Sequence, residues 1–121
     1  MLRALILALL FACSLQAAVP TWVNWSAIAA DATPHADITV TLPAHLTNDI
    51  FLLMAFNRDV DETATVSGWT AFTGSPWDRG TSGRYWLWWK RAASASETNP
   101  LVDFSGTTGD AYAVAAVYRG A

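Results

Sequence analysis

Residues 67–92 decide the fold most clearly, and they read SGWTAFTGSPWDRGTSGRYWLWWKRA. The middle of this stretch, residues 73–83, is rich in glycine, serine and proline, which are the residues of turns and loops. The end, residues 84–91 (RYWLWWKR), is strongly aromatic. Aromatic side chains favour a pleated, half-buried surface, so the sequence predicts a turn-and-loop segment followed by a β-strand.

Strand alternation assigns the aromatic side chains of residues 84–91 to two faces. One face carries Tyr85, Leu87 and Trp89, and the other carries Trp86 and Trp88. Because aromatic residues dominate core energetics, Trp86, Trp88 and Trp89 are all expected in the core, and so is Trp69 at the start of another strand.

Three further segments have strand patterns. Residues 38–42 (ITVTL) alternate strictly between apolar and polar side chains, and Pro43 stops the run. Residues 50–56 (IFLLMAF) are apolar on both faces, which predicts a central strand covered by another layer. Residues 111–118 (AYAVAAVY) carry small alanines on one face, which leave room for bulky partners such as the tryptophans of residues 84–91.

Weaker strand signals occur at residues 21–28, 69–72 and 101–104. The total is about seven short strands, separated by turn signals, with no convincing amphipathic helix. The predicted fold is therefore all-β, an antiparallel β-sandwich of jelly-roll or immunoglobulin-like type.

The N-terminus has the layout of a secretory signal peptide. Arg3 supplies a positive charge, residues 4–12 are apolar, and residues 14–18 offer small residues for cleavage. The apolar run is shorter than the ~20 residues of a membrane span. We expect residues 1–18 to be removed and residues 19–121 to form one secreted, periplasmic or cell-surface domain. An uncleaved interfacial helix and a wrongly assigned start codon are the alternatives.

Cys13 is the single cysteine of the chain. Residues 10–13 (LFAC) are similar to the lipobox of bacterial lipoproteins, but Phe11 departs from the small or branched residue usual there. Cleavage after Ala17 or Ala18 is therefore expected, and the mature domain then has no disulfide.

The charge balance argues against two classes of partner. The chain has seven Lys and Arg against ten Asp and Glu, and loss of Arg3 leaves six against ten, a net charge of about −4. No run of basic residues occurs. Binding to nucleic acid or to an anionic membrane surface would lack its electrostatic driving force, so neither is expected.

Short motifs in a fixed order resemble a known module. They are Leu42-Pro43-Ala44, Asn48-Asp49-Ile50-Phe51-Leu52-Leu53, Ser67-Gly68-Trp69-Thr70, Trp89-Lys90-Arg91-Ala92 and Tyr118-Arg119-Gly120-Ala121. This order resembles a β-sandwich module that recurs in phage tail or fibre proteins and in bacterial secreted proteins, with the pattern GDLLL, P-x-GW, YYK-A and YRG. The resemblance covers residues 39–121.

Two departures from that pattern favour a bacterial secreted protein over a virion part. Asn48 stands where the module usually has glycine, and the chain has a leader, which phage structural proteins generally lack. The resemblance also implies a continuation after YRG into a second half, so the chain is expected to be a truncated copy.

No catalytic motif is present. The sequence contains no G-x-S-x-G, H-E-x-x-H or Walker motif, so no catalytic residue, cofactor or enzymatic activity is expected. The two histidines, His35 and His45, are expected to be solvated loop residues. Asp59, Asp61 and Glu62 form either a calcium-binding loop or a solvated turn, and the sequence leaves both open.

Trp77 is the candidate binding residue, flanked by Asp78 and Arg79 in the predicted loop 73–83. It is either a loop anchor or a contact residue, because loops on a rigid sandwich usually carry its binding function. The sequence predicts a secreted, non-catalytic module with a structural or adhesive role that contacts a glycan or protein through loops. The alternative is a carbohydrate-binding portion or a fragment of a small secreted hydrolase.

Overall fold

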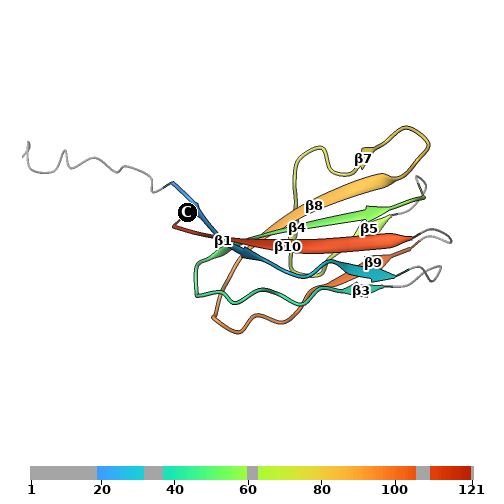
Figure 1. The fold of residues 1–121 in the computed structure, drawn as a ribbon. Helices are drawn as coiled ribbons and strands as arrows, with labels where there is room; N and C mark the ends of the chain where they lie inside the picture. Colours follow the sequence, from blue (N-terminus) through green and yellow to red (C-terminus); the bar gives the residue numbers. More distant parts are fainter. Residues whose placement is uncertain (1–18, 32–36, 60–62, 106–109, 121) are drawn as a thin grey trace, which may run out of the picture.

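The computed structural model describes residues 19–31, 37–59, 63–105 and 110–120. Over these residues the fold is all-β, with two antiparallel sheets packed together, no helix and no closed barrel (Figure 1). The predicted fold class is confirmed. The predicted signal peptide, including Cys13, lies outside the described residues.

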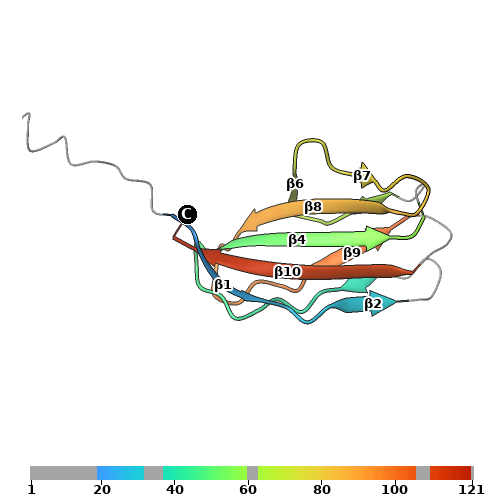
Figure 2. The same ribbon diagram turned by 45° about the horizontal axis from the view of Figure 1, so that its top comes forward.

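The larger sheet has seven strands and the smaller has three. In the larger sheet the order is β1 (Thr21–Trp25), β10 (Ala111–Arg119), β4 (Ile50–Asn57), β8 (Arg84–Arg91) and β6 (Thr70–Ala71), while β2 (Ala29–Asp31) pairs with β10 and β7 (Trp77–Asp78) pairs with β8. In the smaller sheet the order is β3 (Ile38–Thr39), β9 (Leu101–Phe104) and β5 (Ala64–Thr65). Figure 2 shows β8, β4 and β10 side by side, with β9 of the smaller sheet behind them.

The long strands lie where the sequence predicts them. Strands β8 and β9 have the predicted bounds, and β4 and β10 each extend one residue beyond them. The predicted strand at residues 38–42 is shorter, because its ladder meets a proline. Val40 donates its N–H to the carbonyl oxygen of Pro100 at 3.0 Å, but Pro100 has no N–H to return. The alternation nevertheless continues, and Val40 is fully buried.

The predicted strand at residues 21–28 ends earlier, at Trp25 of β1, and a second strand, β2, follows it beyond the predicted range, after a break at Ser26. The Ser26 N–H donates to the Ala115 carbonyl oxygen at 2.7 Å, and the Ser26 Oγ accepts the Ala115 N–H at 3.0 Å. The Ser26 hydroxyl thus accepts a hydrogen bond from β10 that a backbone carbonyl would otherwise accept. This lets the chain bend between β1 and β2, which pair with the same edge of β10. Strands β5 and β7 were not predicted from the sequence.

The core lies between the two sheets. Trp86 and Trp88 are 3% and 4% exposed and belong to one cluster with Ala111, Ala113 and Ala115 of β10. The small face of β10 and the tryptophans of β8 therefore contribute to the same core. The smaller sheet contributes Ile38, Val102 and Phe104 to the same cluster, and the Phe104 ring meets Trp86 edge to face at 5.6 Å.

The motifs of the resemblance meet at one end of the larger sheet. The buried carboxylate of Asp49 accepts hydrogen bonds from Arg119 Nε at 2.9 Å and Nη2 at 2.7 Å, and a third from the Leu46 N–H at 2.8 Å. The hydrogen-bonded Arg119 guanidinium lowers the pKa of Asp49 to about 2. The ionised pair therefore ties the start of β4 to the end of β10.

The remaining motifs pack around the same end. Ala92 exchanges backbone hydrogen bonds with Asn48 and Asp49, at 2.8 Å each, and is buried against Phe51. Trp69 is half-buried, and its ring lies 5.7 Å from that of Phe51. Asn48 has a φ of +71°, a left-handed conformation that glycine adopts freely and asparagine tolerates. This conformation explains why asparagine can replace the glycine of the resembled pattern.

Candidate contact surface

The predicted loop 73–83 contains a short edge strand, β7, and Trp77 lies on it. Trp77 is paired with Tyr85 of β8 and is 44% exposed. Its indole lies beside Gly74, where an added Cβ would be 3.6 Å from the indole nitrogen. The indole of Trp77 therefore packs against Gly74 on one side, and nearly half of the residue remains accessible to solvent.

Asp78 faces away from Trp77, and Arg79 follows it in a turn. Asp78 is paired with Arg84, and its Oδ1 accepts a hydrogen bond from Arg84 Nε at 2.6 Å, which lowers the pKa of Asp78. Neighbouring strand residues point to opposite faces, so the Asp78 side chain lies across the strand from Trp77. Arg79 opens a turn in which its N–H donates to the Gly83 carbonyl oxygen at 2.8 Å.

Trp77 belongs instead to a larger surface, the outer face of the seven-stranded sheet. Residues directly opposite in an antiparallel pair share a face, so the register defines its members. They are Trp22 and Trp25 of β1, Tyr112, Val114, Ala116 and Tyr118 of β10, Ile50, Leu52, Met54 and Phe56 of β4, Tyr85, Leu87, Trp89 and Arg91 of β8, Thr70 of β6 and Trp77 of β7. Phe72 extends the β6 pairing, since its N–H donates to the Leu87 carbonyl oxygen at 2.9 Å.

Exposed apolar side chains gather on this outer face. Of the eleven large hydrophobic residues that are exposed in the described part of the chain, eight lie on or at the edge of it: Trp22, Trp25, Ile28, Met54, Phe72, Trp77, Trp89 and Tyr112. Trp89 is 38% exposed, so its predicted place in the core is wrong. The error arose from treating all the tryptophans of β8 alike, although alternation separates Trp89 from Trp86 and Trp88.

Strand β4 is covered on one face by the other sheet, as its apolar pattern predicted. Phe51, Leu53 and Ala55 are buried toward the smaller sheet, whereas Met54 on the other face is 48% exposed. The strand is central within its sheet, as expected, but its outer face remains uncovered by the residues that the structure describes.

Two apolar hollows lie on the outer face. One has a volume of about 170 Å³ and is lined by Ile28, Met54, Ala55, Phe56, Tyr112, Ala113 and Val114. The other, of about 290 Å³, is lined by Pro20, Ile50, Leu52 and Tyr118. The hollows lie toward opposite ends of β4, and projecting indoles from β1 and β8 lie on the same face.

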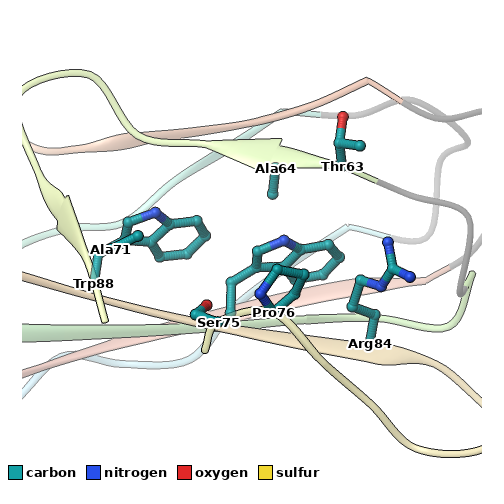
Figure 3. A pocket seen from close by; sticks show the side chains of 8 residues that line it. Thr63, Ala64, Ala71, Ser75, Pro76, Arg84 and Trp88 are labelled. Atoms are coloured by element: carbon teal, nitrogen blue, oxygen red, sulfur yellow. The ribbon is translucent and has the colours of Figure 1, made fainter. Parts of the chain in front are cut away.

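A third cavity opens at the edge between the sheets, where β5 faces β6 and β8 (Figure 3). It has a volume of about 170 Å³ and is lined by Thr63, Ala64, Ala71, Ser75, Pro76, Arg84, Trp86 and Trp88. Its polar groups are already engaged: Ser75 Oγ accepts the Leu87 N–H at 3.1 Å, and Arg84 pairs with Asp78. The cavity thus offers an incoming molecule mainly the apolar surface of two core indoles.

The other candidate residues from the sequence have different outcomes. His45 is partly buried and held by the backbone, since its Nε2 accepts the Glu97 N–H at 3.1 Å and its Nδ1 lies 2.8 Å from the Pro43 oxygen. The prediction of a solvated loop histidine is therefore wrong for His45. Of the proposed calcium ligands, Asp61 and Glu62 lie outside the described residues, as does His35.

Among the described residues, no group of three or more His, Cys, Asp or Glu side chains is placed to hold a metal ion. The described part of the chain also holds no helix with the length and hydropathy that membrane crossing requires.

Comparisons with models of protein families, with curated proteins and with solved structures find no match to this chain. The two-sheet, all-β architecture therefore stands without an identified family.

Proposed function

We propose that the chain is a secreted, non-catalytic β-sandwich module with a structural or adhesive role, and that the outer face of its seven-stranded sheet is the surface that makes contact. The single observation behind this proposal is the segregation of eight exposed large hydrophobic side chains to one face. Trp77 is part of this surface, at its β7 edge.

The size of the surface supports an interaction role. An aromatic side chain covers ~150–250 Å² when it is buried, so eight large side chains that are 37% to 70% exposed present on the order of 700 Å². The largest apolar patch on a typical soluble monomer is ~300–600 Å². Exposure of a larger patch to water is unfavourable, and a partner would relieve it.

The chemistry of the face favours a protein partner over a glycan. A sugar needs hydrogen-bonding groups beside each stacked ring to hold its hydroxyls, in addition to an aromatic platform. Between the two edges of this face, the polar side chains are three tyrosines and Thr70, with Arg91 at one end. The hollow between Pro20 and Tyr118 is lined by apolar side chains and one tyrosine. An apolar protein surface matches these features better.

The resemblance to the module of phage fibre and bacterial secreted proteins supports the same role. The aspartate of its first strand motif and the arginine of its closing motif correspond to Asp49 and Arg119, and these two residues form an ion pair in which the carboxylate is buried. The first and last motifs are therefore joined to each other in this fold. We propose that the chain is a bacterial secreted relative of that module.

The native size of the protein in unfractionated secreted material tests this proposal. Met54 and Leu101 give a matched pair, because they are 48% and 47% exposed on the outer faces of the larger and smaller sheets. The wild type and Leu101→Lys should elute in a complex, and Met54→Lys should elute as a single chain, since a lysine on the apolar face loses its hydration on contact. Elution of the wild type as a single chain, or of Met54→Lys with the complex, contradicts the proposal.

Trp77→Ala sharpens the same experiment. Loss of a half-exposed indole at a sheet edge should change the free energy of unfolding by less than about 1 kcal/mol. It should weaken the contact by ~2 kcal/mol, as truncation of an aromatic hot spot does. If the variant unfolds as readily as a core variant, Trp77 anchors the fold and does not act as a contact residue.

A further inference from the structure

We infer that the partner of this outer face is a second copy of the chain, so that two sandwiches stack their seven-stranded sheets about a two-fold axis. This inference rests on the proposed function, because it names the occupant of the proposed contact surface. Three properties of the face support it: its charge, its area and its shape.

The charge of the face permits self-association. In a two-fold interface the same patch meets itself, so any charged residue near the axis would lie close to its own copy and repel it. The central strands β4 and β10 contribute no charged side chain to this face. The one charged member, Arg91, lies at the end of β8, and its guanidinium donates to the Asn48 carbonyl oxygen at 3.1 Å.

The area of the face suits a dimer of this kind. Stable interfaces of standard size bury ~800 Å² on each partner. The eight exposed large hydrophobic side chains of this face present on the order of 700 Å² to solvent, because each is roughly half exposed. The half-buried members, such as Leu52, Leu87 and Val114, add to it. The same face of a second copy is therefore large enough to bury the whole patch.

The face has both projecting side chains and hollows, so two copies of it could interlock. Projecting side chains such as Trp25 and Trp89 are 66% and 38% exposed, and hollows of about 170 and 290 Å³ lie between the strands. A self-complementary surface needs projections and hollows on the same patch. Two stacked sheets lie ~10 Å apart, which allows side chains from both faces to interdigitate. Met54 lies near the middle, on the central strand.

Sedimentation of the purified protein across a wide dilution series tests the inference. The protein is expressed as the full chain in a secreting host and purified as exported. The wild type should sediment with twice the mass of one chain at high concentration and dissociate on dilution. Met54→Lys and Tyr112→Lys should sediment as single chains throughout, and Leu101→Lys should behave as the wild type. Circular dichroism confirms that each variant is folded.

The outcomes separate this inference from the proposed function. A purified protein that is a single chain at every concentration overturns the dimer, and if the secreted material still holds it in a Met54-dependent complex, the contact function stands with a different partner. A broad distribution of masses, or loss of the doubled mass in Leu101→Lys, also overturns the dimer, because either shows association without the two-fold face. If both experiments give a single chain, the contact function fails as well.

Discussion

The two sheets of this sandwich present very different outer faces. On the smaller sheet the outward residues of β3, β9 and β5 include Thr39, Asp103 and Thr65, with Leu101 as the exposed large hydrophobic residue. On the larger sheet the outward residues are almost all aliphatic or aromatic. The inner faces of both sheets contribute apolar residues to one core. The two sheets therefore differ in their outer faces, not in the way they pack together.

The contrast shows what strand patterns report. Strand β9 alternates between exposed and buried residues, as expected for a strand with one solvent-exposed face and one buried face. Strand β4 is apolar on both faces, which indicates that both are to be covered, and only one is covered within the described chain. This pattern is the basis for the proposal that a partner covers the outer face of the larger sheet.

The largest expected difference separates two adjacent residues of β8. Trp88 is 4% exposed on the inner face and Trp89 is 38% exposed on the outer face. Trp88→Ala should lower the free energy of unfolding by roughly 3–5 kcal/mol, because it leaves a cavity in the core. Trp89→Ala should lower it by about 1–2 kcal/mol, because much of that indole is already in water. Urea unfolding of the two variants measures both values.

Equal losses in these two variants would contradict the distinction between the faces. A milder pair, Trp88→Phe and Trp89→Phe, serves as the control if Trp88→Ala fails to fold. The order of the two losses should be preserved in that pair, because the burial of each position is unchanged.

A smaller effect is expected from the ion pair of Asp49, which is buried, and Arg119. Its hydrogen bonds lower the pKa of Asp49 from 3.8 to about 2 in the folded protein. A lowered pKa stabilises the folded state fully above about pH 4, and this contribution is lost as the pH falls through about 2. The free energy of unfolding should therefore fall by about 2 kcal/mol over this range on account of Asp49. Asp49→Asn should remove that part of the pH dependence.

Acid titration of stability in the two proteins provides the measurement. Matching pH profiles for the wild type and Asp49→Asn would show that the ion pair contributes nothing. Arg119 is half exposed at the end of β10, so solvent and salt reach one side of the pair. The contribution should accordingly shrink in high salt.

Much of the fold was predictable, because its long strands carry local signals. The aromatic run of β8 and the apolar run of β4 each defined a strand to within one residue. Strand β7 was missed, because its pairing with β8 depends on the turn that brings Trp77 opposite Tyr85. The break at Ser26 was missed for a similar reason, since it depends on a hydrogen bond to Ala115, a residue far along the chain.

The candidate site was only partly predictable. Trp77 was predicted to be an anchor or a contact residue of the loop 73–83, and the residue is 44% exposed. Asp78 faces away from Trp77, because sequence neighbours on a strand point to opposite faces. Trp22, Trp25, Met54 and Tyr112 were missed, because the strand order that assembles them into one surface is not local. The signal available in the sequence was that the alternate residues of 50–56 and 85–89 that face outward are apolar.

Hydroxyl-radical footprinting measures directly whether a partner covers the outer face of the larger sheet, in the unfractionated medium of a secreting host and after extensive dilution. Met54, Trp89 and Trp77 should be oxidised much more slowly before dilution than after it, because a bound partner shields their side chains. Leu101 on the smaller sheet should be oxidised at the same rate in both samples. Equal rates for Met54 and Trp89 before and after dilution would show that no partner covers this face.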